Sequence, residues 1–313
     1  MDKYIIMLIG VIAIVPTIAF SQKADSVYDA SVSPPTFSEI SYGDHHRQIL
    51  DFWKAESNEP TPLVFVVHGG GWGGGEKERV HRFVDVQPLL DAGISIVAIN
   101  YRLIRHAKED GVEPPVKACL YDAARALQYV RSKASEWNIN KDLIAAAGGS
   151  AGACTSLWLA FHPDLADPDS SDPVSRESTR VYCAGVKEPQ TTLDPKQIRE
   201  WIPNGKYGGH AFGKENFEEF LSDRESLLSL IAEYSPYSLV SADDPSIYMF
   251  YKNQPAIGQK VDNATHSSNY GVKLQERCVE LGIDCEVQYP GAVGTTYQTQ
   301  TDFLIGMLKK NKN

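Results

Sequence analysis

Positive charge is scarce in this sequence. It has 30 Lys and Arg residues against 40 Asp and Glu residues, which gives a formal net charge of −10 at pH 7. Nucleic-acid binding needs clustered Lys and Arg, so this balance excludes nucleic acid as an expected partner. It also disfavours polyanionic substrates, and net charge of this size mainly favours solubility.

Cysteine is scarce as well. An odd number of five cysteines does not describe a disulfide-built scaffold, and most are expected to be small buried hydrophobic side chains. Cys278 and Cys285 fall near the end of a predicted helix and the start of the next predicted strand, so these two could pair. The cysteine spacing is not that of a zinc site, and we predict no metal and no cofactor.

A long apolar run occurs only at the N-terminus. Lys3 precedes an almost wholly apolar stretch, and Ala19 and Ser21 place small residues at positions −3 and −1 before Gln22. This pattern predicts a signal peptide over residues 1–21, followed by a loose polar leader over 22–36. The alternative is an uncleaved anchor. We therefore expect export to the periplasm or the extracellular space, with no membrane contact beyond the signal.

The rest of the chain alternates short apolar runs with helical patterns. Such runs are typical of strands buried on both faces of a parallel sheet. They occupy residues 47–53, 62–67, 94–101, 143–147, 181–186, 247–251 and 285–289. Helical patterns occupy residues 116–136, 150–161, 270–281 and 299–308. The alternation predicts one α/β domain over 37–313 with a mostly parallel, doubly wound sheet. Residues 190–243 interrupt it and are interpreted, by analogy, as a cap-like insertion over an active site.

The strongest motif is Gly148-Gly149-Ser150-Ala151-Gly152, which lies between a predicted strand and a predicted helix. That is the context required of a G-x-S-x-G nucleophile elbow. Flanking glycines permit a tight turn, which lifts the Ser150 hydroxyl to the carboxyl edge of the sheet. The alternative is an ordinary glycine-rich turn between a strand and a helix.

A second motif, His68-Gly69-Gly70-Gly71-Trp72, directly follows another predicted strand. Consecutive glycines let backbone N–H groups point into a site, where they could hold an oxyanion together with the N–H of Ala151. A phosphate-binding loop would need Gly-Lys-Ser or Gly-Lys-Thr after the glycines, whereas here Lys77 precedes Glu78. A flexible glycine loop is the remaining alternative.

These two motifs, with Asn100-Tyr101-Arg102, resemble the α/β-hydrolase-fold esterases of the hormone-sensitive-lipase and feruloyl- or acetyl-xylan-esterase type. The resemblance covers most of the chain from about residue 37. It implies that Ser150 is the nucleophile and that Gly70, Gly71 and Ala151 donate to the oxyanion. It also implies that His68 is structural and that Arg102 and Asp122 form a buried ion pair.

The sequence departs from that pattern at the other two catalytic positions. No Gly-x-x-Asp stretch follows residues 247–251, and no histidine follows His266. Asp262 could replace the acid or be a solvated loop aspartate. His266 could serve as the base or be an exposed histidine at a helix start. His210, in the cap-like insertion, is a weaker candidate. The remaining histidines are expected at the surface: His45, His46, His81, His106 and His162.

Two functions remain open at this stage. The first is an exported serine carboxylesterase that hydrolyses small acyl esters, such as acetyl or feruloyl esters on a polysaccharide, with an unusual base. The second is a catalytically impaired relative that binds a ligand or partner in the old pocket, because a serine without a base is a poor nucleophile. Three tryptophans could line an acyl or sugar pocket or belong to the core: Trp72, Trp158 and Trp201.

Overall fold

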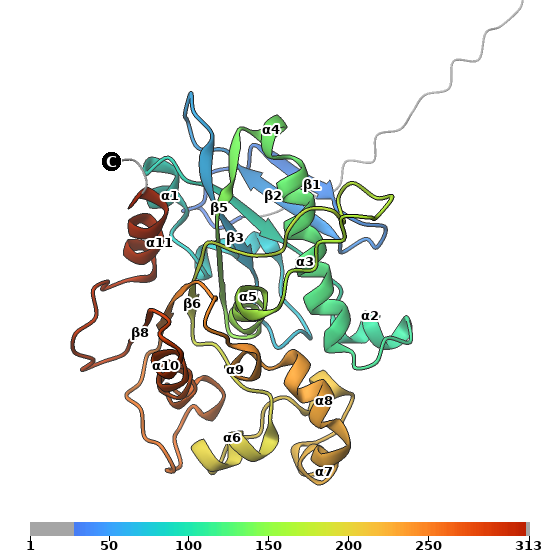
Figure 1. Ribbon diagram of the computed structural model, residues 1–313, viewed down its shortest axis with the longest axis vertical. Helices are drawn as coiled ribbons and strands as arrows, with labels where there is room; N and C mark the ends of the chain where they lie inside the picture. The colour runs from blue at the N-terminus through green and yellow to red at the C-terminus, as the bar shows by residue number, and fades with distance from the viewer. Residues whose placement is uncertain (1–27, 311–313) are drawn as a thin grey trace, which may run out of the picture.

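The computed structural model describes residues 28–310, which form one mixed sheet with helices on both faces (Figure 1). The strand order is β1-β2-β4-β3-β5-β6-β7-β8, and the pairs from β4 through β8 are parallel. β1 and β2 form the antiparallel edge. The strands are β1 (Phe37–Ser41), β2 (Ile49–Trp53), β3 (Thr61–Val67), β4 (Ser95–Ile99), β5 (Ile139–Gly149), β6 (Cys183–Lys187), β7 (Ser246–Phe250) and β8 (Cys285–Gln288). The predicted α/β-hydrolase fold is confirmed.

Helices occupy most of the segments between the strands. On the way to β6 they are η1 (Lys77–Arg82), α1 (Val86–Asp91), α2 (Ile104–Glu109), α3 (Val116–Ser132), α4 (Ala134–Trp137) and α5 (Ala151–Phe161). After β6 they are α6 (Pro195–Trp201), η2 (Gly209–Phe212), α7 (Phe217–Ser222), α8 (Arg224–Tyr234), α9 (Pro236–Leu239), η3 (Ala264–His266), α10 (Asn269–Leu281) and α11 (Gln300–Lys309). The four predicted helical patterns correspond to α3 with α4, α5, α10 and α11.

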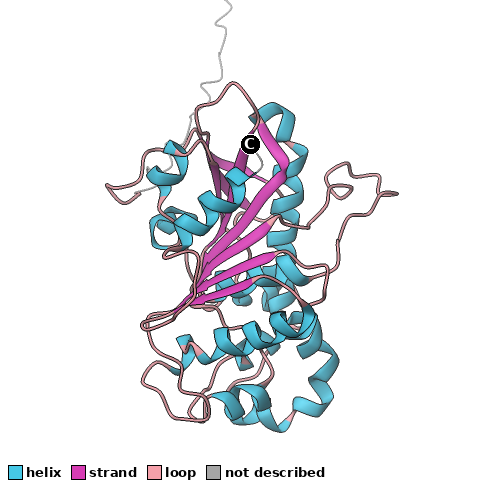
Figure 2. Ribbon diagram, turned by 60° about the vertical axis from the view of Figure 1, so that its left-hand side comes forward, coloured by secondary structure: helices cyan, strands magenta, loops and turns pink. Residues whose placement is uncertain are grey.

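The parallel strands are buried on both faces, as their continuous apolar runs predicted. Along β3, Phe65 and Val67 pack into the core under α3, α5 and α10, whereas Val64 and Val66 pack into the core under α1 and α11. The alternation follows from the period of two in a strand. Figure 2 shows the strands as a twisted layer with helices on either side. The carboxyl ends of the parallel strands therefore meet at one edge, where α/β folds place their sites.

The N-terminal part of the described chain is better ordered than a loose leader. The Tyr28 hydroxyl donates to Asp51, and the Tyr28 ring packs edge-on against Trp53 with centroids 5.5 Å apart. The Trp53 indole N–H donates to Ser33 O at 2.7 Å. Part of the predicted leader, at Tyr28 and Ser33, thus contacts β2. The predicted signal peptide lies outside the described residues. Among the described helices, none combines the length and apolar character needed to cross a membrane.

The segment predicted as a cap-like insertion contains five short helices and lies between β6 and β7. These helices, α6 to α9 with η2, gather beyond the carboxyl edge of the sheet, at the bottom of Figures 1 and 2. Several contacts tie the segment to neighbouring loops, and two of them serve as examples. The Gly258 N–H donates to Trp201 O at 3.0 Å, and the His210 ring reaches Gly71 O.

Cys278, at the end of α10, and Cys285, at the start of β8, lie side by side, but the disulfide that they could form is absent from the structure. Both thiols are buried and free, and the hydrogen bond from Cys278 is the main reason that the pKa of Cys285 is raised. Burial of the other three cysteines agrees with their predicted role as small apolar side chains.

Candidate active site

Ser150 occupies a strained turn between β5 and α5. Its backbone has φ 54° and ψ −124°, a conformation that costs energy for a residue with a side chain. The turn is tight because α5 starts against β3: a Cβ on Gly152 would lie 2.1 Å from Val67 O. The Ser150 N–H donates to Lys187 O at 3.0 Å, which fixes the turn to β6. The serine side chain is thereby held, half-buried, at the carboxyl edge of the sheet.

His266 lies directly against this serine. Its Nε2 is 2.9 Å from Ser150 Oγ, within the hydrogen-bonding range of a general base and a nucleophile. The ring comes from η3, in the long loop between β7 and α10. Of the two alternatives for this histidine, the contact with the nucleophile is the one that the structure shows.

The surroundings of His266 favour its neutral form. Burial is the main cause that lowers the pKa of His266 below its ordinary value, and the Lys252 charge lowers it further. The Glu188 carboxylate acts in the opposite direction and raises the pKa. A neutral ring has a lone pair on Nε2 that can accept the serine proton, as base catalysis requires.

Asp262, the predicted acid, does not contact the His266 ring. Its side chain is exposed on the loop before η3, and it makes no hydrogen bond with His266. The charges that act on the His266 ring are instead those of Glu188 and Lys252. The structure thus joins the predicted base to the predicted nucleophile but leaves the predicted acid apart from both.

The glycine motif forms a compact loop after β3. Gly70 and Gly71 have φ angles of 109° and 61°, which side chains rarely adopt. Two carbonyls of the loop are engaged within the protein: Gly70 O accepts from the N–H groups of Gly73 and Gly74, and Gly71 O accepts from His210. The N–H groups of Gly70, Gly71 and Ala151 donate no hydrogen bond to a loop or turn carbonyl of the described residues. They are available as oxyanion donors.

Arg47 holds this loop, a role that the sequence analysis missed. Its guanidinium donates to Gly75 O at 2.8 Å and to Tyr101 O at 2.8 Å, and it pairs with Glu76 at 2.9 Å. Its fourth contact is with His68 Nε2 at 3.3 Å. One buried side chain therefore connects the start of β2, the glycine loop and the end of β4.

The residues of the Asn100-Tyr101-Arg102 motif belong to the same hydrogen-bond network. Asn100 accepts the Lys77 N–H at 2.7 Å, and the Tyr101 hydroxyl donates to His68 O at 2.9 Å. The Arg102 guanidinium pairs with Asp122 at 2.7 Å, as the resemblance implied. The motif is a frame around the oxyanion loop.

His68 is a buried member of that frame, as the resemblance implied. Its ring stacks on Tyr101 with centroids 4.3 Å apart, and its Nδ1 lies 2.8 Å from Gly69 O. Burial lowers the pKa of His68 to about 3, so the ring is neutral. His210 holds the same loop from the other side, because its Nε2 lies 3.0 Å from Gly71 O.

Two of the histidines expected at the surface are buried, and that expectation was wrong for them. His162 packs on Trp158 with ring centroids 4.4 Å apart and lies 3.0 Å from Glu233. His106 packs against the turn that carries His45 and His46. The periodicity of short segments such as α2 is too weak to show which side faces inward.

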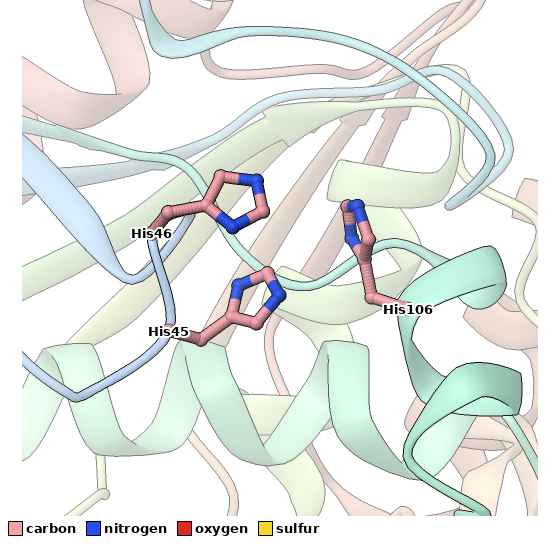
Figure 3. Close-up of side chains that lie close together, drawn as sticks. All are labelled: His45, His46 and His106. Carbon is pink, nitrogen blue, oxygen red and sulfur yellow. The ribbon is translucent and has the colours of Figure 1, made fainter.

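Figure 3 shows His45 and His46 with their rings gathered near that of His106. Three imidazoles close together resemble a metal-ligand set. However, His45 Nδ1 accepts the Arg47 N–H and His106 Nδ1 accepts the Leu103 N–H, both at 3.1 Å. A neutral ring that accepts at Nδ1 carries its proton on Nε2, and that nitrogen then has no lone pair for a metal. We assign this cluster no metal role.

The three tryptophans belong to the core. Trp72 donates to Thr155 Oγ1 at 3.0 Å, and Trp158 donates to Glu233 O at 3.0 Å. Trp201 packs edge-on against Tyr237 with centroids 5.1 Å apart. All three indoles are buried, which selects the second of the two alternatives for them.

A family model described as BD-FAE matches residues 50–258, a span that includes both Ser150 and the oxyanion loop. The chain belongs to the BD-FAE family. His266 lies just beyond the matched span. A probable carboxylic ester hydrolase, LipM, from Mycobacterium tuberculosis is 33% identical over 151 residues, which are 47% of this chain and 32% of LipM. Carboxylesterase NlhH from the same species is 31% identical over 109 residues, which are 35% of this chain and 32% of NlhH. The chain thus spans about a third of the length of these curated relatives.

Solved structures share the fold at low identity. A truncated carbohydrate esterase from gut microbiota aligns with a TM-score of 0.65 and 20% identity, over 92% of this chain and 99% of that chain. An acetyl ester-xyloside bifunctional hydrolase from Caldicellulosiruptor lactoaceticus aligns with a TM-score of 0.56 and 20% identity, over 77% of each chain. These likenesses establish the α/β-hydrolase fold.

Proposed function

We propose that this BD-FAE family member is a serine carboxylesterase that hydrolyses small acyl esters. The observation that carries the proposal is the 2.9 Å contact between His266 Nε2 and Ser150 Oγ, next to a loop of free backbone N–H donors. Nucleophile, base and oxyanion donors are the parts that acyl transfer requires. The curated relatives are named as ester hydrolases, which supports the same class.

The chemistry follows from these groups. Ser150 Oγ attacks the acyl carbon while His266 Nε2 takes its proton, and the N–H groups of Gly70, Gly71 and Ala151 hold the oxyanion. The protonated ring then gives its proton to the departing alcohol, which leaves an acyl-serine. A water molecule then attacks the acyl carbon while the neutral ring takes its proton. The ring returns this proton to Ser150 Oγ as the carboxylic acid is released, which regenerates the free serine.

The substrate class that we propose is a small ester, with acetyl or feruloyl groups on a polysaccharide as the physiological candidates. The support is the family model and two structural neighbours, one a carbohydrate esterase and the other an acetyl ester-xyloside bifunctional hydrolase. We also propose that the protein acts after export, on the basis of the N-terminal sequence pattern alone.

The alternative, a catalytically impaired binding protein, rested on the missing histidine after residues 285–289 and on the missing Gly-x-x-Asp stretch after residues 247–251. The contact of His266 with Ser150 supplies a base from another loop and removes the main reason for that alternative. Function as an esterase is therefore the proposal that the geometry favours.

The test is hydrolysis of p-nitrophenyl esters from acetate to octanoate, together with acetate release from acetylated xylan. We expect turnover of the short esters, and loss of that turnover to the background in Ser150→Ala. Wild-type protein that is folded but no faster than Ser150→Ala on every ester would contradict the proposal.

A further inference from the structure

Glu188 lies between the elements that carry the nucleophile and the base. It directly follows β6, which pairs with β5 on one side and β7 on the other. Its neighbour Lys187 accepts the Ser150 N–H at 3.0 Å, and its own N–H donates to Phe250 O at 2.7 Å. This glutamate is therefore fixed at the carboxyl edge of the sheet, one strand from the serine, beside the strand whose loop carries His266.

The two residues that follow this glutamate fasten the loop that carries the base. Pro189 O accepts the Tyr251 hydroxyl at 2.8 Å, and the Gln190 side chain donates to Thr265 O at 2.6 Å. Thr265 directly precedes His266. The position of the imidazole is thus set by the segment after β6.

Glu188 has a strained backbone and a buried carboxylate oxygen without a hydrogen-bond partner among the described residues. Its backbone has φ 52°, a strained value for a residue other than glycine, and strain of this kind concentrates at functional sites. One carboxylate oxygen pairs with Lys252 Nζ at 3.1 Å. The other, Oε1, is buried and has no hydrogen-bond partner among the described residues. A buried acceptor without a donor is costly unless a donor reaches it during function.

The His266 ring has one nitrogen with a hydrogen-bond partner and one without. Its Nε2 is engaged by Ser150, whereas no hydrogen bond to its Nδ1 is found within the described part of the chain. The charged groups that act on this ring are Glu188 and Lys252, from the segments after β6 and β7. Asp262, on the ring's own loop, is exposed to solvent. Glu188 and the His266 ring make no hydrogen bond with each other in the structure. An acceptor (Oε1) and a ring nitrogen (Nδ1) that each lack a hydrogen-bond partner among the described residues therefore lie in neighbouring segments.

We propose that Glu188 is the acid of this site, a positioning residue that accepts the Nδ1–H of His266 and stabilises the ring when it is protonated. This inference rests on the proposed function. The chain order Ser150, Glu188, His266 keeps the order nucleophile, acid, base that is usual in this fold. The acid follows β6 and the base follows β7, so each lies one strand nearer the nucleophile than in the esterase pattern that the sequence resembles. That displacement explains why no histidine is needed after β8.

The test is the pH dependence of kcat/KM for p-nitrophenyl acetate in four proteins: wild type, Glu188→Gln, Lys252→Met and Asp262→Asn. Glu188→Gln should lower kcat about 10²- to 10⁴-fold with KM unchanged, and should move the acidic limb to lower pH. Lys252→Met should move the limb to higher pH, because it removes a positive charge facing the ring. Asp262→Asn should match wild type. If Glu188 had only a structural role, the acidic limb would not move to lower pH in Glu188→Gln and to higher pH in Lys252→Met.

Near-wild-type activity and an unmoved limb in Glu188→Gln would overturn the inference, as would finding the loss in Asp262→Asn instead. Failure of the proposed function is read separately, by the pKa of the His266 ring from NMR titration of the same four proteins. The pKa should fall in Glu188→Gln and rise in Lys252→Met even if wild type hydrolyses no ester. Equal ring pKa values in wild type and Glu188→Gln would contradict the role of Glu188 whatever the turnover.

Discussion

His266 Nε2 lies 2.9 Å from Ser150 Oγ, although the two residues are 116 positions apart in the chain. The contact joins two parts of one sheet edge that β6 separates: the turn after β5 and the loop after β7. In the proposed mechanism it supplies a base to Ser150, whose expected histidine partner after β8 does not exist in the sequence.

Loss of the contact between His210 and Gly71 should weaken oxyanion binding. His210→Leu removes the ring that lies 3.0 Å from Gly71 O, so the loop is less well held. We expect kcat to fall roughly tenfold, less than the 10²- to 10³-fold cost of losing a donor outright. His210→Gln keeps an N–H donor and should recover part of the rate. Equal kcat in wild type and His210→Leu, measured with p-nitrophenyl acetate, would show that this contact does not matter.

The buried ion cluster around Lys77 should carry much of the stability of the β1–β2 edge. The Lys77 side chain is fully buried and pairs with Asp51 at 2.9 Å as well as with Glu39 and Glu78. Burial alone would lower the pKa of Lys77, but the carboxylates outweigh it and raise the pKa above its ordinary value. Lys77→Met would leave buried carboxylates unpaired, which should cost about 3–5 kcal/mol in the free energy of unfolding.

The measurement for Lys77 is urea unfolding followed by fluorescence. The matched control is Lys54→Met, because Lys54 is an exposed lysine just after β2. That control should stay within about 0.5 kcal/mol of wild type. A Lys77→Met protein as stable as the control would show that the cluster contributes no net stability.

Acid should destabilise the fold in part through His68. Burial lowers its folded-state pKa to about 3, whereas an unfolded chain titrates near 6.5. Below about pH 6.5 the unfolded state therefore binds a proton that the folded state does not, and stability falls as pH drops toward 3. Between pH 7 and pH 5 this one group should account for about 2 kcal/mol.

The check compares the pH 7 to pH 5 loss of unfolding free energy in wild type and in His68→Asn. Because each protein is compared with itself, the static effect of the substitution cancels. The loss should be smaller in His68→Asn. Identical losses would mean that His68 is protonated in the folded state or does not titrate differently on unfolding.

The sequence predicted the sheet well because its parallel strands are buried on both faces. Runs such as residues 62–67 and 143–147 have no polar face to confuse with a helix, and they correspond to β3 and β5. β1 was missed because Phe37–Ser41 is an exposed edge strand with mixed polarity. The short helices α1 and α2 were missed because six residues are too few to show a period.

The site was predictable only where its residues are local in sequence. The nucleophile elbow and the glycine loop are short motifs, and the fold places both where the motifs imply. The Arg47 network and the approach of Glu188 to the His266 loop depend on which strands are neighbours, which spacing cannot reveal. The positive φ of Glu188 leaves no mark in the sequence, because glycine is the residue expected there.

The most direct test of this account is the rate at which a fluorophosphonate labels Ser150, followed by intact-protein mass spectrometry in wild type, His266→Gln and His46→Gln. The probe needs an activated serine but no particular acyl or alcohol group. Because the proposed mechanism has His266 take the serine proton, His266→Gln should label about 10²- to 10⁴-fold more slowly than wild type. His46→Gln, at an exposed histidine, should label like wild type. Equal labelling of Ser150 in His266→Gln and wild type would contradict the account, because the 2.9 Å contact would then not activate the serine.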